Sequence, residues 1–161
     1  MNTTKVAKGI GRKVMIIYFG IGSNIGDREA NLREALRLLD ERGGKQLACS
    51  SVDRSAPQGF VSENEFANIV AIYETNCSPE ELLHITQQIE REMGRTQKSH
   101  DGIHYDRVID IDLLKAYEGD REIVVQTPTL SLPHLRMEER DFVMVPLHEA
   151  EAIFNSLITK Q

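Results

Sequence analysis

The stretch Val108-Ile109-Asp110-Ile111-Asp112-Leu113-Leu114 sets two carboxylates two residues apart on an apolar run, and it predicts a β-strand over residues 108–114. Successive side chains of a strand point to opposite faces, so Asp110 and Asp112 share one face while Ile111 points to the other. Mg²⁺ is commonly held by one or two carboxylates together with substrate phosphates, which makes this pair a candidate metal site. On spacing alone, a half-buried strand whose acidic face meets water is the simpler explanation.

Three more strands and a first helix are expected upstream of that strand. Residues 14–19 are apolar and precede a glycine-rich turn, which is typical of a strand buried on both faces. Asp27 suits the N-cap of a helix whose leucines recur at helical spacing and whose end is marked by Gly43-Gly44. Residues 46–52 and 66–75 are expected to be strands joined by a long polar loop.

The segment Ser78-Pro79-Glu80-Glu81 predicts the start of a second helix. Ser78 is the expected cap, Pro79 takes the first helical position, and Glu81 completes a capping box. The helix is expected to run to Gly94, and residues 108–114 follow it as the fourth strand.

The resulting order, β-α-β-β-α-β, predicts an α+β fold of the ferredoxin-like type, an antiparallel sheet with two helices on one face. C-terminal additions are expected beyond this core: a weak strand over residues 123–125, a turn bounded by prolines, and a last helix around residues 138–148. Enzymes, regulatory ligand-binding domains and RNA-binding domains all use this architecture, so individual residues must indicate the function.

The length of 161 residues predicts one domain over residues 14–161, preceded by a flexible extension over residues 1–13. The chain has 19 Lys and Arg against 25 Asp and Glu, and this net charge of −6 argues against nucleic-acid binding. No apolar run approaches the roughly 20 residues of a membrane-spanning helix, so no membrane association is expected. Cys49 and Cys77 form no C-x-x-C motif and are expected to be reduced core residues. We expect a cytoplasmic monomer with small-molecule partners.

Five motifs, each weak alone, occur in order along the chain. They are Gly22-Ser23-Asn24, Phe66-Ala67-Asn68, Gly94-Arg95, Arg107-Val108-Ile109-Asp110-Ile111-Asp112 and Leu132-Pro133-His134. Together they resemble the 6-hydroxymethyl-7,8-dihydropterin pyrophosphokinase family of folate biosynthesis. The resemblance covers roughly residues 14–150 and includes Arg140-Asp141-Phe142 after the histidine.

The resemblance implies transfer of a pyrophosphoryl group from ATP to the hydroxymethyl group of 6-hydroxymethyl-7,8-dihydropterin, giving AMP and the pterin diphosphate, with two Mg²⁺ ions at Asp110 and Asp112. Such a transfer needs aligned oxygens and neutralised phosphate charge, which metal ions and Arg or His side chains provide. The catalytic residues implied by match to the family are Arg95, Arg107, Asp110 and Asp112, and the nucleotide-binding residues are His134, Arg140, Lys98 and Gln87. The implied pterin-binding residues are Ser55, Gly59, Phe66, Asn68 and Phe142, with the two rings sandwiching the pterin.

The chain departs from the family pattern in the segment before residue 107. His104-Tyr105-Asp106 stands where the family commonly has Trp-Gly-Pro, and Gln97 stands where many members have a second arginine. Thr129 likewise replaces an arginine found in some members. We expect weaker nucleotide binding, or phosphate contacts that shift to Lys98, His100 or His104.

Each site residue also has a simpler explanation when taken singly. Phe66 is typical of a core side chain, Asn68 of a turn cap, and Gln87 with Glu90 of an ordinary solvated helix face. Gln87 and Glu90 match family positions near the substrate sites. The joint pattern, rather than any single residue, favours the enzyme.

Two alternatives to the pyrophosphokinase interpretation remain open at this point. The main one is a ferredoxin-like regulatory module that binds a small ligand without catalysis, which would not need the carboxylates and the cations together. The minor one is a transition-metal site in the segment before residue 107, where no closed tetrahedral ligand set is visible. Its candidate ligands are His100, Asp101, His104 and Asp106.

Overall fold

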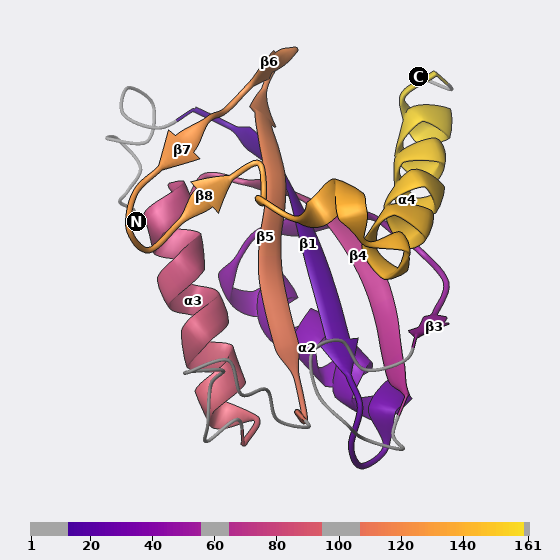
Figure 1. Cartoon of the computed structure of the whole chain (residues 1–161). Coiled ribbons are helices and arrows are strands. Elements are labelled where there is room, and N and C mark those ends of the chain that lie inside the picture. The colour runs from indigo at the N-terminus through magenta and orange to yellow at the C-terminus, as the bar shows by residue number, and fades with distance from the viewer. Residues whose placement is uncertain (1–12, 56–64, 95–106, 160–161) are drawn as a thin grey trace.

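The computed structural model describes residues 13–55, 65–94 and 107–159. Within these residues the main sheet has the strand order β2-β4-β1-β5-β6, and β3 pairs with β4 as well (Figure 1). All its pairings are antiparallel. The strands are β1 (Met15–Ser23), β2 (Lys45–Cys49), β3 (Asp53–Ser55), β4 (Phe66–Thr75), β5 (Asp110–Glu118) and β6 (Arg121–Glu122).

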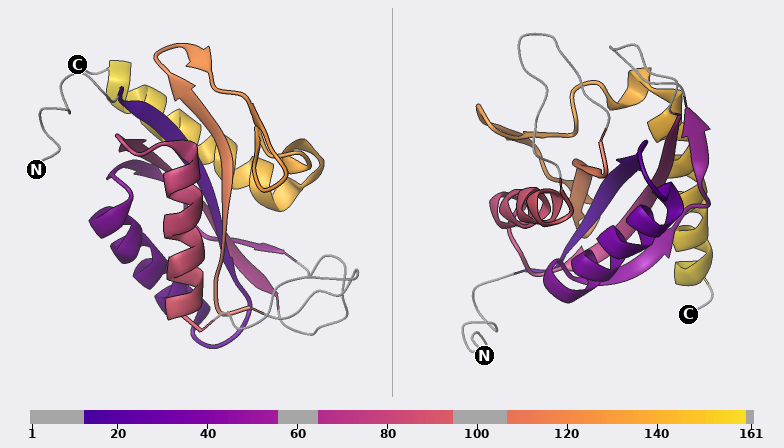
Figure 2. Two further views of the ribbon diagram at one scale, coloured as in Figure 1. Left: turned by 90° about the vertical axis from the view of Figure 1, so that its left-hand side faces the viewer. Right: turned by 90° about the horizontal axis from the view of Figure 1, so that it is seen from below.

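The helices cover both faces of this sheet. α2 (Arg28–Arg42) and α3 (Pro79–Glu92) lie on one face, and α4 (Asp141–Thr159) lies on the other (Figure 2). The ferredoxin-like α+β class is therefore confirmed, and the order β-α-β-β-α-β is formed by β1, α2, β2, β4, α3 and β5, with the short strand β3 and the helix α4 as additions. No helix in the described part of the chain is long and apolar enough to cross a membrane.

Both predicted helix starts are confirmed at atomic detail. Asp27 caps α2 by accepting a hydrogen bond from the Ala30 amide at 3.1 Å. Ser78 and Glu81 form the expected capping box on α3, each side chain accepting from the other residue's amide, at 3.1 and 2.8 Å. α3 ends at Glu92, two residues before the predicted end at Gly94.

Each face of the sheet carries its own hydrophobic core. On the α2/α3 face the buried strand residues include Ile17, Phe19, Ile21, Ala67, Ile69, Tyr73, Ile111 and Leu113. Ile109, directly before β5, is buried in the same core, and Cys49 and Cys77 pack against it as free cysteines. On the α4 face they include Tyr18, Val70, Ile72 and Leu114, which pack with Val143, Leu147 and Ala150 of α4. Alternation along β1 and β4 thus divides the two cores.

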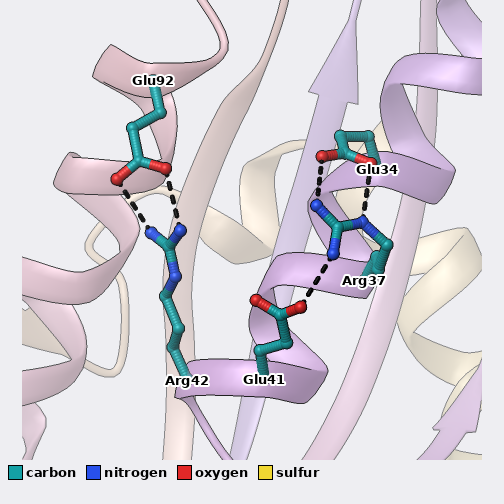
Figure 3. Close-up of polar contacts among 5 residues, drawn as sticks. All are labelled: Glu34, Arg37, Glu41, Arg42 and Glu92. Atoms are coloured by element: carbon teal, nitrogen blue, oxygen red, sulfur yellow. Dashed lines mark hydrogen bonds and ion pairs between the residues drawn. The ribbon is translucent and has the colours of Figure 1, made fainter.

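Figure 3 shows surface ion pairs of the two helices on one face, and one of these pairs joins α2 to α3. Arg42 donates two hydrogen bonds to Glu92, at 2.8 and 3.0 Å, so the C-terminal ends of the two helices are joined by a bidentate pair. Arg37 pairs with Glu34 and Glu41 within α2. Exposed pairs of this kind contribute only about 0–1 kcal/mol each, so the two hydrophobic cores determine how the helices pack.

The strand predicted over residues 46–52 is wrong beyond Cys49. β2 ends there because Ser50 leaves the regular ladder: its amide donates to the Val70 carbonyl and its hydroxyl accepts from the Val70 amide, both at 3.0 Å. Ser51 then binds the Glu149 carboxylate through its amide and hydroxyl, at 3.0 and 2.9 Å. The chain resumes pairing only at β3, since Ser side chains compete with the backbone for hydrogen bonds.

The strands predicted over residues 14–19 and 108–114 are displaced at their ends. The first continues to Ser23, and the second begins at Asp110 and continues to Glu118. The continuation beyond Leu114 could not be anticipated, because the register of β1 and β5 shifts between Tyr18 and Phe19. Leu114 is the extra residue of this bulge, so the alternation of faces is interrupted there.

The C-terminal elements also differ from the prediction. Residues 123–125 do not form one strand; instead β7 (Val125–Gln126) pairs with β8 (Ser131–Leu132). The helix predicted around residues 138–148 starts before the observed helix α4 and ends well before it. Met137–Glu139 is a separate 3₁₀ turn, η1, and α4 then continues to Thr159, where Phe154 still packs on the α4-side core.

Candidate active site

Asp110 and Asp112 lie on the α4 face of β5. Ile109, Ile111 and Leu113 point into the core on the opposite face, as the alternation predicts. Both aspartates are partly exposed, and the Asp110 side chain is 23% exposed. The two carboxylates therefore project from the first and third residues of β5 toward the α4 side of the sheet, where a ligand can reach them.

Glycines of β1 form the floor beside these carboxylates. Gly22 pairs with Asp110 on one side and with Asn68 on the other, and Gly20 pairs with Asp112. Ile21 points into the α2/α3 core, so both glycines face the α4 side. A Cβ atom on Gly22 would lie 2.9 Å from Asn68 Oδ1 and 3.3 Å from a ring carbon of Phe66, which shows how closely the neighbouring side chains approach.

Three of the predicted pterin-binding residues meet at the start of β4. Asn68 is 7% exposed, and its Nδ2 donates to Ser55 Oγ at 2.9 Å. The same group lies 3.4 Å from the Asp53 carbonyl oxygen. Phe66 is two residues away on the same face and is partly exposed. An aromatic ring and an oriented amide thus lie side by side, an arrangement that suits a flat, polar-edged ligand.

Arg107 is held beside the first aspartate by the end of β1. The Arg107 amide donates to Asn24 Oδ1 at 2.7 Å, and the Asn24 amide donates to the Arg107 carbonyl at 3.0 Å. Asn24 is 1% exposed. Arg107 Nη1 lies 3.4 Å from Asp110 Oδ1, in an ion pair whose arginine side chain is 12% exposed. The Gly22-Ser23-Asn24 motif therefore positions a cation at the carboxylate pair.

A second pair of candidate phosphate-binding side chains, His134 and Arg140, lies on the outer side of β5. The His134 amide donates to the Leu114 carbonyl at 2.8 Å, and His134 Nδ1 accepts from the Arg136 amide at 3.3 Å. Burial lowers the pKa of His134, the charge of Arg140 lowers it further, and the charge of Asp110 opposes the shift. Neutral His134 with Nδ1 as acceptor carries its proton on Nε2, which can donate to an anionic oxygen.

Arg140 and Phe142 lie together at the start of α4. The Arg140 guanidinium carbon is 5.6 Å from the centre of the Phe142 ring, within cation–π range. The Arg140 carbonyl accepts from the Met144 amide at 2.9 Å, so the first turn of the helix holds this residue. The start of α4 thereby presents one cation and one aromatic ring two residues apart.

Gln87 and Glu90 lie on α3, and Glu90 reaches the same outer edge of β5 that His134 contacts. Gln87 is partly exposed. Glu90 is 5% exposed, and its Oε2 accepts from the Ile111 amide at 2.7 Å. The i, i+3 spacing of Gln87 and Glu90 was compatible with a solvated helix face, but Glu90 is buried and does not belong to such a face.

The remaining predicted residues lie outside the described part of the chain. These are Arg95, Lys98 and Gly59, the departures Gln97 and His104-Tyr105-Asp106, and the transition-metal candidates His100, Asp101, His104 and Asp106. Sequence reasoning missed the positioning role of Asn24 and the floor formed by Gly20 and Gly22. The Gly22-Ser23-Asn24 motif was the available signal, but its contacts are with residues far away in sequence.

The donor set fits a magnesium ion that also binds substrate. Among residues 13–55, 65–94 and 107–159, no three or more His, Cys, Asp or Glu side chains form a group that could hold a metal. Two carboxylates on an open face leave coordination positions for water and phosphate oxygens, as Mg²⁺ prefers. Asp110 and Asp112 are the residues that could hold it.

The sequence matches a family model described as 7,8-dihydro-6-hydroxymethylpterin-pyrophosphokinase (HPPK) over residues 18–152. It is 46% identical over 134 residues to the 2-amino-4-hydroxy-6-hydroxymethyldihydropteridine pyrophosphokinase of Porphyromonas gingivalis, covering 83% of this chain and 89% of that protein. It is 41% identical over 135 residues to the Bacillus subtilis protein of the same name, covering 83% and 77%.

The fold also resembles solved structures. A crystal structure of a Plasmodium falciparum HPPK-DHPS variant superposes with a TM-score of 0.66 at 15% sequence identity. The match covers 97% of this chain and 48% of the other, so the chain spans about half the length of that protein. At this identity the likeness shows the fold alone.

Proposed function

Because the chain belongs to the 7,8-dihydro-6-hydroxymethylpterin-pyrophosphokinase family, we propose that it transfers the pyrophosphoryl group of ATP to the hydroxymethyl oxygen of 6-hydroxymethyl-7,8-dihydropterin. The hydroxymethyl oxygen attacks the β-phosphorus, and the bond from that phosphorus to the α,β-bridging oxygen breaks. AMP leaves with the bridging oxygen, and the hydroxyl proton passes to water. The products are AMP and the pterin diphosphate, an intermediate of folate biosynthesis.

One observation carries this proposal: three cross-strand partners form a row over neighbouring strands. Asn68 of β4 pairs with Gly22 of β1, and Gly22 pairs with Asp110 of β5. Strands lie about 4.8 Å apart, so the pterin-binding end of the row is about 10 Å from the carboxylate end. Gly22 has no side chain, so nothing projects from the sheet between Asn68 and Asp110. The hydroxymethyl arm of a pterin held at Asn68 would therefore extend toward the carboxylates.

The pterin half of the site would bind through stacking and amide recognition. Phe66 and Phe142 offer aromatic surfaces, and Asn68 offers an amide whose orientation is fixed by Ser55 Oγ at 2.9 Å. A fixed amide loses little conformational entropy when it binds, which favours a rigid heterocycle. Gly59 would contribute backbone contacts from outside the described residues.

The nucleotide half would bind through cations and a metal. Arg107, His134 and Arg140 would bind phosphate oxygens, for which guanidinium forks are well suited, while Arg95, Lys98 and Gln87 would complete the site. Asp110 and Asp112 would hold Mg²⁺, which when bound neutralises phosphate charge and orients the oxygens for in-line displacement. Burial and Arg140 lower the pKa of His134, which favours its neutral form, and Nδ1 accepts from the Arg136 amide, so Nε2 would donate to a phosphate oxygen.

The identity of the released nucleotide tests the proposal. Purified protein is incubated with ATP, Mg²⁺ and the pterin, and the products are followed by ³¹P NMR. We expect AMP and a pterin diphosphate, with no signal growth when the pterin is omitted. Release of ADP with a pterin monophosphate would contradict pyrophosphoryl transfer. Binding of pterin and ATP without any product would favour the non-catalytic module.

A further inference from the structure

Glu90 is a buried carboxylate that the proposed reaction does not use. Glu90 is 5% exposed, although a glutamate is rarely buried unless its side chain is paired. Its Oε2 accepts a 2.7 Å hydrogen bond from the backbone amide of Ile111. A hydrogen bond of 2.7 Å is at the short end of the range for an N–H donor and an oxygen acceptor, so it constrains the backbone amide that donates it.

The peptide that Glu90 contacts lies between the two candidate metal ligands. Ile111 separates Asp110 from Asp112, and its side chain is 5% exposed in the α2/α3 core. β1 pairs with β5 on one side at this level. On the other side, β6 pairs only with Tyr117 and Glu118 within the described residues. The Ile111 amide thus belongs to an open strand edge, where an acceptor from a helix replaces a missing strand.

The outer edge of β5 is bound at further points. The Leu114 carbonyl accepts from the His134 amide at 2.8 Å, and the Ala116 carbonyl accepts from the Ile123 amide at 2.9 Å. Glu90 makes the contact nearest the start of the strand, at its second residue. Strand ends open most readily, so this contact opposes fraying where the carboxylates lie.

We propose that Glu90 is a positioning residue, which holds the Ile111 peptide and thereby fixes Asp110 and Asp112 on one face at their working separation. Together with the Asn24–Arg107 bond, it restrains the chain on both sides of Asp110. The role depends on an acceptor oxygen at this place and not on the negative charge. The expected effect of Glu90 on turnover rests on the proposed function. Its restraint of the Ile111 peptide does not.

Three variants separate these roles. Glu90→Gln keeps an acceptor oxygen and removes the charge, and Glu90→Leu removes the acceptor at similar size. Glu92→Gln removes a charge from the same helix without touching β5, because Glu92 pairs with Arg42. Amide hydrogen exchange at Ile111, measured by NMR without substrates, reports the backbone contact directly.

We expect Ile111 exchange in Glu90→Leu to accelerate by about tenfold or more, since an edge amide without its acceptor opens freely. In the same variant kcat should fall by about tenfold while KM for the pterin changes by less than about threefold, because the carboxylates and not the pterin site are displaced. Glu90→Gln should restore both values to within about threefold of wild type, as an acceptor-based role requires. Glu92→Gln should match wild type.

Several outcomes would overturn the proposal. They include rapid exchange of Ile111 in the wild-type protein, a folded Glu90→Leu variant with unchanged kcat, and a Glu90→Gln variant as impaired as Glu90→Leu. If Glu90→Leu does not fold, Ile111 protection and kcat in Glu90→Gln decide the question by themselves. Protection of Ile111 in a wild-type protein that forms no AMP would overturn the proposed function and the expected effect of Glu90 on turnover, and would support the backbone contact alone.

Discussion

Asn68 and Asp110 face the same side of the sheet with only Gly22 between them. The residue that would bind the acceptor and the residue that would bind the metal are thus fixed by one backbone ladder. Ladder registers are rigid because each is set by many cooperating hydrogen bonds and by core packing. The distance between the two halves of the site therefore depends on the sheet and not on loops.

Gly22→Ala should impair pterin binding more than nucleotide binding. The added Cβ would lie 2.9 Å from Asn68 Oδ1 and 3.3 Å from Phe66, so both side chains must move. We expect KM for the pterin to rise about tenfold, equivalent to about 1.4 kcal/mol, in steady-state kinetics. Gly20→Ala is the control, since the nearest atoms to its Cβ would belong to the flexible Leu114 side chain, at 3.3 Å. Equal effects of both substitutions on the pterin KM would contradict this account.

Asn24→Ala should lower both stability and turnover. The Arg107 amide loses its 2.7 Å acceptor, which should reduce the free energy of unfolding by about 1–3 kcal/mol in urea denaturation. Arg107 would also lose its fixed place beside Asp110, so kcat should fall. Asn31→Ala loosens the same turn by removing bonds to Ser23 Oγ and the Ile25 carbonyl, and it should leave kcat closer to wild type. A larger loss of kcat in Asn31→Ala would argue against the role of Asn24.

His134 should make the protein less stable in mildly acidic solution. Burial and Arg140 lower its pKa in the native state, so the unfolded chain binds the proton more readily. As pH falls through the ordinary histidine pKa of about 6.5, the free energy of unfolding should decrease, and it should level off below the native-state pKa. His134→Gln should weaken this dependence when urea unfolding is measured from pH 8 to 5. Identical slopes in the two proteins would contradict the assignment.

Tyr18→Phe should destabilise the protein without changing the reaction. The Tyr18 hydroxyl donates to Glu151 Oε2 at 2.7 Å, and Lys115 Nζ lies 3.6 Å from the same oxygen. Burial and this carboxylate raise the pKa of Tyr18, so the hydroxyl remains a donor. We expect a loss of about 1 kcal/mol on thermal or urea unfolding. A matching drop in kcat would mean that this cluster is coupled to the active site.

Sequence patterns predicted the bounds of helices and strands best where neighbouring residues alone determine the local structure. Ser78 and Glu81 specify their helix start through neighbouring amides, and residues 66–75 form a strand with the predicted bounds because both their faces are buried. The shared face of Asp110 and Asp112 also followed from alternation alone.

The missed features depend on contacts between distant parts of the chain. The bulge at Leu114 exists only in the pairing of β5 with β1. Ser50 ends β2 by bonding Val70. Asn24 acts on a residue 83 positions away, and Glu90 on one 21 positions away. No single-sequence periodicity encodes such pairings, which is why the supporting contacts of the site became visible only in the folded chain.

In the proposed reaction, Asp110 and Asp112 on one face of β5 hold the Mg²⁺ that pyrophosphoryl transfer requires. The most direct test measures AMP and pterin diphosphate formed by wild type, Asp110→Asn and Asp112→Asn across a Mg²⁺ titration, with circular dichroism as the check on folding. We predict equal amounts of the two products in wild type, complete loss with EDTA, and no detectable turnover in either folded variant. Near-normal turnover in either variant, or wild-type activity independent of divalent cations, would contradict the account.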